Sequence, residues 1–224
     1  MIQITARRPA GFGQRALAWS LDLLLLSPVL VWLAWPPLAR ALAATMEWIV
    51  QVQGWLLERM LASVELTSLT ATAQALLDDP VQGAAAHAQI ARLSAAVLHS
   101  GLVVAAVTAL YFVAFEASAW QATPGKRLLG LRVETLAGGR LPLSRALLRH
   151  ASGAASWLTL NIGHLLVALR SDRRALHDLM AGTRVTAQGP LPAWGGVLLA
   201  ILVALTVLAP AGFVLQALAR VAAG

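Results

Sequence analysis

The sequence contains 224 residues, of which 58% are hydrophobic and only 12% are charged, and its mean hydropathy is +0.71. Soluble domains carry about 25% charged residues, so this composition argues against an ordinary soluble domain and indicates an integral membrane protein with the lipid bilayer as its main partner. The net charge of +7 does not indicate nucleic-acid binding, because the basic residues flank apolar segments, and the lack of cysteine excludes thiol chemistry.

The first apolar segment, Ala16–Leu38, carries Asp22 as its one formal charge. A helix of that length spans about 35 Å, which is enough to cross the hydrocarbon core of a bilayer. A carboxylate inside such a helix is costly, so we expect it to face protein or water, and Arg15 lies two turns earlier on the same face. Residues 1–14 are expected to form a basic arm, and Pro36-Pro37 to end or kink the span.

A strongly acidic segment follows at about 41–91, where one arginine stands against five carboxylates. Apolar residues recur there at helical spacing, and Asp78-Asp79-Pro80 with Gly83 indicates a turn, so we expect an inserted helical hairpin. A second helix is expected to start near Ala84. Its charge-free portion, Leu93–Phe115, is long enough to cross a bilayer, so a second span is expected at about 92–116, with Glu116 at its end.

The segment Gln121–Arg149 is basic instead, with six basic residues against one glutamate. The positive-inside rule predicts that this segment and the N-terminus are cytoplasmic, in an inner (plasma) membrane protein that crosses the bilayer several times. The acidic hairpin is then extracytoplasmic. Two spans joined by this hairpin place the N-terminus and the basic segment together on the cytoplasmic side, which agrees with both assignments.

The apolar segment at about 144–169 is ambiguous, because it contains several polar residues and two glycines. It either spans the membrane or is re-entrant or interfacial, and we favour the second alternative. The alternating stretches Leu131–Thr135 and Thr183–Thr186 predict two strands, with a hairpin-type turn at Gly138-Gly139, and these strands can pair only on one side of the membrane. Residues 193–219 are expected to form a further C-terminal transmembrane helix. The expected fold is therefore an all-α polytopic membrane protein, a helical bundle with a small cytoplasmic β element.

Three motifs occur in order along the chain: Arg15 with Asp22, then Thr123-Pro124-Gly125-Lys126-Arg127, and then His177-Asp178. In this order the sequence resembles the RDD family of membrane proteins, over most of Gly11–Thr186 except the acidic hairpin at about 41–91, and residues 15–186 are expected to form the RDD-like membrane domain. The resemblance implies that Arg15 is the family arginine and that Asp22 and Asp178 are its two aspartates. The family's biochemical role is poorly defined, although a transport role, including cation/proton antiport, has been suggested for some members.

From these residues we expect Asp22 and Asp178 to converge on Arg15 at the cytoplasmic membrane surface, with His177 beside them. The network is either structural or functional, with one aspartate as a proton or cation carrier. His177 either relays protons or hydrogen-bonds the neighbouring turn. For Glu116 we favour an exposed residue at headgroup level over a member of the network. Thr123, Gly125, Lys126 and Arg127 are expected to form a basic turn whose Lys126 and Arg127 contact anionic lipid headgroups.

No cofactor, metal site or enzymatic activity is expected, because the histidines lack ligand spacing and no nucleophile–base pair or phosphate-binding loop is present. Two functions stay open. One is a small transporter or ion/proton exchanger that uses Arg15, Asp22 and Asp178. The other is a membrane scaffold or accessory subunit that recruits protein partners, with the network purely structural. Small residues in the second span also permit a homo-oligomer.

Overall fold

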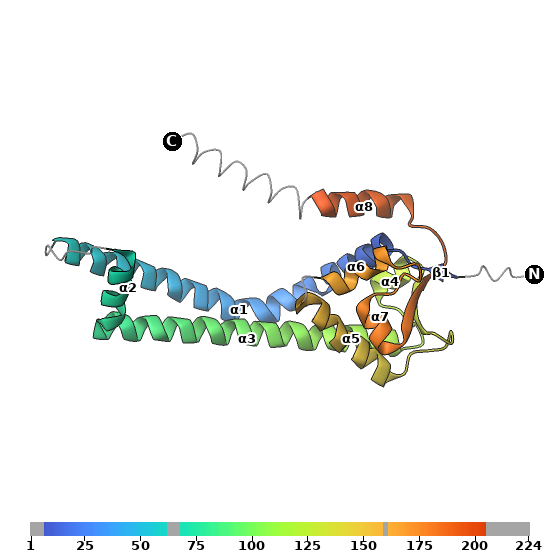
Figure 1. The fold of residues 1–224 in the computed structure, drawn as a ribbon, viewed down its shortest axis with the longest axis horizontal. Coiled ribbons are helices and arrows are strands. Elements are labelled where there is room, and N and C mark those ends of the chain that lie inside the picture. The colour runs from blue at the N-terminus through green and yellow to red at the C-terminus, as the bar shows by residue number, and fades with distance from the viewer. Residues whose placement is uncertain (1–6, 62–67, 159–160, 205–224) are drawn as a thin grey trace, which may run out of the picture. The chain divides into compact units, whose positions relative to one another are not determined.

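A computed structural model describes residues 7–61, 68–158 and 161–204 of the chain (Figure 1). Residues 1–6 of the expected basic arm, Glu65 of the acidic segment and residues 205–219 of the expected C-terminal span lie outside the described residues. The described chain falls into two compact units, one formed by residues 1–26 and 108–224 and the other by residues 27–107. Both long helices contribute to both units.

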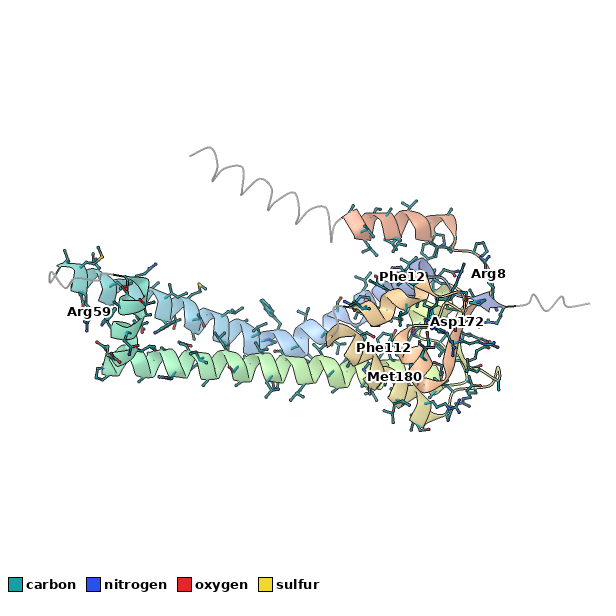
Figure 2. The ribbon with its side chains drawn as sticks, in the orientation of Figure 1. Arg8, Phe12, Arg59, Phe112, Asp172 and Met180 are labelled. Carbon is teal, nitrogen blue, oxygen red and sulfur yellow. The ribbon has the colours of Figure 1, made fainter. Side chains whose placement is uncertain are left out.

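Two helices are long and apolar enough to cross a membrane: α1 (Phe12–Leu61) and α3 (Pro80–Ala117). Only 22% of the apolar 18-residue stretch within α1 is buried, and only 11% of the corresponding stretch within α3. The core helix of a soluble protein is mostly buried, so neither helix fits that description. Side chains instead project outward along both helices (Figure 2). The large apolar side chains of Trp32 and Leu110 are each 75% exposed. The expectation of apolar, membrane-type helices is therefore confirmed.

The first helix begins earlier and ends later than expected. It starts at Phe12, inside the predicted arm, and passes through Pro28, Pro36 and Pro37 without ending. Of the two alternatives expected for Pro36-Pro37, an end of the helix is therefore wrong, and a kink stays a prediction. Proline is tolerated within apolar helices of membrane proteins because neighbouring groups can satisfy the backbone carbonyls that it leaves without a partner.

In the unit formed by residues 27–107, α1 and α3 run antiparallel, joined through α2 (Leu69–Asp78). The amide of Gln89 donates to the carbonyl of Ala44 at 2.9 Å, and Ser100 donates to the carbonyl of Ala34 at 2.7 Å. Asp79 caps α3, because its carboxylate accepts from the backbone N–H groups of residues 81 and 82. This cap explains why α3 begins at Pro80, four residues before the predicted start.

The other unit contains a three-stranded antiparallel sheet in the order β1-β3-β2: β1 (Arg8–Pro9), β2 (Leu131–Thr135) and β3 (Thr183–Ala187). Val133 stands opposite Val185, and the inward side chains of both strands pack with Leu17, Ala18 and Val113 in a common apolar core. The predicted β element is therefore confirmed. The added strand β1 had no sequence signal, because two residues are too few to show alternation.

Four short helices and α8 (Ala193–Val203) complete this unit. They are α4 (Pro124–Leu128), α5 (Leu143–Leu158), α6 (Ile162–Leu169) and α7 (Leu176–Ala181). The ambiguous segment thus forms two helices, α5 and α6, with a left-handed residue at Asn161 between them.

Candidate functional site

Asp22 is completely buried and is held by three neutral hydrogen-bond donors. Its Oδ1 accepts from the hydroxyl of Tyr111 at 2.8 Å and from the backbone N–H of Gly125 at 2.7 Å, and its Oδ2 accepts from the hydroxyl of Thr123 at 2.5 Å. The donors come from the end of α3 and from the start of α4. The carboxylate therefore fixes α1 against both of these elements.

The Thr-Pro-Gly-Lys turn is built to meet this carboxylate. Thr123 is the N-cap of α4 and Pro124 follows at the first helical position, where a missing N–H costs nothing. Gly125 then presents its N–H to Asp22 in a space where a Cβ atom would lie 2.4 Å from the carbonyl oxygen of Ala18. The motif is thus a docking turn, and the glycine is required because α1 lies so close.

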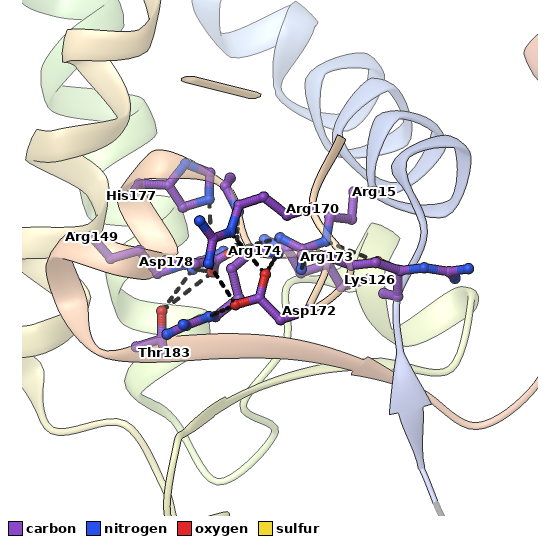
Figure 3. Close-up of polar contacts among 12 residues, drawn as sticks. Arg15, Lys126, Arg149, Arg170, Asp172, Arg173, Arg174, His177, Asp178 and Thr183 are labelled. Carbon is purple, nitrogen blue, oxygen red and sulfur yellow. Dashed lines mark hydrogen bonds and ion pairs between the residues drawn. The ribbon is translucent and has the colours of Figure 1, made fainter. Parts of the chain in front are cut away.

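A second cluster consists of five alternating charges, each from a different helix (Figure 3). Lys126 Nζ lies 2.6 Å from Glu116 Oε1, and Glu116 Oε2 accepts from Arg149 Nε at 3.0 Å. Arg149 Nη1 in turn pairs with Asp178 Oδ1, and Asp178 Oδ2 pairs with Arg15 Nη1 at 2.5 Å. We call these five residues, Lys126, Glu116, Arg149, Asp178 and Arg15, the ion network.

The ion network is buried and its remaining polar atoms are largely satisfied. Arg149 is 6% exposed, Glu116 4% and Asp178 0%. Arg149 also donates to the hydroxyl of Thr183 at 2.9 Å, Asp178 accepts from the N–H of Ala175 at 2.9 Å, and Arg15 donates to the carbonyl of Arg173 at 2.6 Å. Ion pairs can be retained at such burial only where these additional hydrogen bonds offset the loss of water.

The charges hold one another in the ionised state. Burial by itself raises the pKa of the Asp178 carboxyl, but the guanidinium groups of Arg149 and Arg15 outweigh it and lower that pKa. Burial alone lowers the pKa of Arg149, whereas Asp178 and Glu116 raise it, and the net shift is upward. Asp178 is therefore a carboxylate at every physiological pH.

The expectation that both aspartates converge on Arg15 is half wrong. Arg15 pairs with Asp178 as predicted, but Asp22 contacts Tyr111, Thr123 and Gly125 instead. The reason is distance along the helix: the two turns between Arg15 and Asp22 separate them by about 10 Å in rise, whereas the α4 turn reaches Asp22 directly.

Two further expectations are corrected at the ends of α3 and α4. Glu116 is buried between Lys126 and Arg149 rather than exposed at the membrane edge. Lys126 is also buried and pairs with Glu116, so its ammonium group does not face lipid headgroups. Arg127 remains exposed, with its guanidinium 4.2 Å from the centre of the Trp120 ring.

His177 lies beside the ion network without a hydrogen bond to it. Its Nε2 is 4.0 Å from Asp178 Oδ1, and its ring centre is 5.2 Å from that of His164. Burial lowers the pKa of His177 well below its usual value, and the charge of Arg149 lowers it further. The imidazole is therefore neutral at physiological pH. Among the described residues, no group of three or more His, Cys, Asp or Glu side chains could hold a metal ion.

Sequence reasoning missed two residues of the site. Arg149 is the central residue of the ion network, and Tyr111 donates its phenol hydrogen to Asp22. The signals were weak but present. Arg149 is the last charged residue before a long stretch without Asp, Glu, Lys or Arg, and Tyr111 is the single tyrosine of the chain, within an apolar segment. A polar side chain in such a setting usually has a buried partner.

This arrangement defines an apolar helical protein in which the two aspartates of the motif are buried and its arginine pairs with one of them, all within the unit formed by residues 1–26 and 108–224. The chain belongs to the RDD family, whose family model matches residues 9–182. Its relatives include two Bacillus subtilis (strain 168) proteins named "Uncharacterized protein YxaI", 30% identical over 93 residues, and "Uncharacterized protein YckC", 38% identical over 71 residues.

The YxaI alignment covers 42% of this chain and 61% of the relative, and the YckC alignment covers 30% and 47%. The chain thus matches less than two thirds of the length of either relative. No solved structure matches the chain.

Proposed function

We propose that this chain is a multi-pass inner-membrane protein whose N-terminus and sheet face the cytoplasm. Two apolar helices with mostly exposed surfaces support the membrane assignment. The excess of basic residues between the second span and α5, against the acidic residues between the two spans, supports the orientation.

Within that membrane we propose a non-enzymatic scaffold or accessory subunit, in which the ion network is a structural clamp. The observation that carries this proposal is the alternation of five mutually paired charges from five helices, of which all but Arg15 are buried. A proton or ion carrier has to change its charge or release its partner during a cycle. Asp178 and Glu116 are each fixed by two cations, which opposes such a change.

Asp22 supports a second candidate function, exchange of protons or cations. Among the residues that the structure describes, its hydrogen-bond partners are a tyrosine, a threonine and a glycine N–H, and none of them carries a positive charge. A carboxylate without a counter-ion inside a membrane helix is a group that a proton or a small cation can neutralise. This candidate depends on Asp22 alone.

Replacing Asp22 with Asn distinguishes the two functions. The full-length chain is reconstituted into liposomes that contain a pH-sensitive dye, and proton flux is recorded after Na⁺ or K⁺ is added outside. Purification yield and melting temperature are measured in parallel. Asp172→Asn is the matched control, because Asp172 is a carboxylate of the same unit that pairs with Arg170 and Arg174 in an accessible loop.

For the scaffold we expect no cation-dependent flux from the wild-type protein and a lower yield or melting temperature of Asp22→Asn. Exchange would be established by cation-dependent proton flux in the wild-type protein that Asp22→Asn abolishes while its purification yield stays normal. Asp172→Asn should then keep the wild-type flux. This combination of results would refute the scaffold proposal.

A further inference from the structure

A second basic site lies outside the ion network. A cavity of about 250 Å³ is lined by three arginines, Arg7, Arg127 and Arg132, together with Trp120 and Gln188 and three apolar or glycine residues. Arg7 precedes β1, Arg127 belongs to α4, Arg132 belongs to β2 and Gln188 follows β3. The chain therefore brings three arginines to one cavity from separate elements of the same unit.

These positive charges are not neutralised within the cavity, because none of the residues that line it is acidic. Burial lowers the pKa of Arg7, and the charge of Arg132 lowers it further, so the two guanidinium groups repel each other. The charge of Glu134 also acts on Arg7, but its carboxylate is paired with Arg184 at 2.9 Å. An anion in the cavity would remove the repulsion.

The geometry of the side chains suits a phosphoryl group. Guanidinium groups bind phosphate oxygens through parallel hydrogen bonds, and three of them can address several oxygens at once. The Trp120 ring holds the Arg127 guanidinium in place from one face at 4.2 Å, which leaves its N–H edge free to donate. Within the described part of the chain, the Arg7 side chain makes one hydrogen bond, a long one of 3.4 Å to the hydroxyl of Thr186.

We propose that Arg7, Arg127 and Arg132 form a binding site for a phosphoryl anion, supplied either by a phospholipid headgroup or by a soluble phosphate compound. The site shares no residue with the ion network, and it includes neither Asp22 nor any of the hydrogen-bond partners of Asp22 described above. It is therefore independent of whether the protein is a scaffold or an exchanger.

The test is calorimetric titration of the purified full-length chain in a neutral detergent. The probes are dioctanoyl phosphatidylglycerol, inorganic phosphate and dioctanoylglycerol, which has the same acyl chains without a phosphate. The variants are Arg127→Gln and Arg132→Gln. Arg8→Gln is the matched control, because Arg8 is the exposed neighbour of Arg7 and does not line the cavity (Figure 2).

We expect a phosphate-bearing probe to bind, and each of Arg127→Gln and Arg132→Gln to weaken its binding about tenfold at unchanged melting temperature, since charge-assisted hydrogen bonds are lost. Arg8→Gln should leave the affinity within about twofold of the wild type, because a charge that makes no contact acts weakly through solvent. Binding of the phospholipid alone identifies a headgroup as the source, and binding of inorganic phosphate alone identifies a soluble compound. Competition between the two probes shows that one site accepts both.

Three results would overturn the proposal. The first is that neither phosphate probe binds the folded wild-type chain. The second is that dioctanoylglycerol binds as tightly as the phospholipid. The third is that Arg8→Gln weakens phosphate binding as much as Arg127→Gln does. Arg132 is exposed on β2, so Arg132→Gln is expected to fold. This variant keeps the test decisive even if Arg127→Gln does not fold.

Discussion

Arg149 shares one guanidinium group between Glu116 and Asp178, and its position on α5 makes that helix the centre of the ion network. Removing one partner from a buried ionic cluster leaves the opposite charges without compensation, which costs about 3–5 kcal/mol. We therefore expect Arg149→Met to lower the free energy of unfolding by about that amount. Unfolding of the purified chain in detergent, followed by circular dichroism, measures the change.

Arg145 is the matched control for this variant. It lies one turn earlier on the same helix, and its side chain is exposed, so Arg145→Met removes the same charge without removing a buried pair. Surface substitutions of this kind usually change stability by less than about 0.5 kcal/mol. Equal losses for the two variants would show that the network does not stabilise the fold.

Because His177 is buried, we expect the free energy of unfolding to depend on pH. Burial and the charge of Arg149 lower its pKa in the folded chain, and Asp178, which acts in the opposite direction, does not compensate. As the pH falls below about 6.5, the unfolded chain takes up a proton at this residue while the folded chain does not. The stabilisation is therefore complete above that pH and is lost on acidification, by up to about 1.4 kcal/mol per pH unit.

Melting curves recorded from pH 7.5 down to pH 5 test this prediction. His177→Gln should reduce the acid-side loss of stability, because the side chain that titrates only in the unfolded state is gone. His99→Gln, which changes an exposed histidine of α3, is the control. An unchanged slope in His177→Gln would exclude His177 as the source.

At the scale of the elements, the contact between α1 and α4 depends on Gly125. A methyl group there would lie 2.4 Å from the carbonyl of Ala18 and 2.9 Å from the carboxylate of Asp22, and the backbone carbonyl cannot move aside. We expect Gly125→Ala to separate the turn from Asp22 and to destabilise the fold by about 1–3 kcal/mol.

Gly153→Ala provides the comparison, because a Cβ at this position of α5 meets no atom within 4 Å. Alanine is the better helix former, so that variant should be neutral or stabilised by up to about 1 kcal/mol. The difference between the two variants in thermal unfolding is the measured quantity. Similar stabilities would mean that α4 does not need its close approach to α1.

The same elements show how far sequence reasoning reaches. The strands β2 and β3 were predictable because alternation along five residues is a local signal, and the apolar helices were predictable from length and composition. Continuation of α1 through Pro36-Pro37 was not, because an apolar environment changes what proline does to a helix. Arg149 and Tyr111 were missed for another reason: their partners lie 29 and 89 residues away, and no local pattern encodes such a pairing.

For the whole molecule, the number of bilayer crossings depends on the helices α5 and α6. The helices α5 and α6 contain 16 and 8 residues and are separated by a left-handed residue, so they extend only about 24 Å and 12 Å. Neither reaches across a hydrocarbon core of about 30 Å. Residues on both sides of this pair are therefore predicted to share the cytoplasmic side.

The absence of cysteine from the sequence makes labelling of single-cysteine variants direct. Ala119→Cys and Ser171→Cys, both at exposed positions that flank the α5–α6 pair, should react with a membrane-impermeant maleimide in inside-out vesicles and not in intact spheroplasts. Ala73→Cys, in the exposed part of α2, should show the opposite pattern, since the acidic segment is predicted to face the other side. Labelling of Ser171→Cys from outside would mean that the segment at 144–169 spans the membrane. The strand after residue 182 would then need a further crossing to pair with β2, so this one position tests the topology of the whole chain.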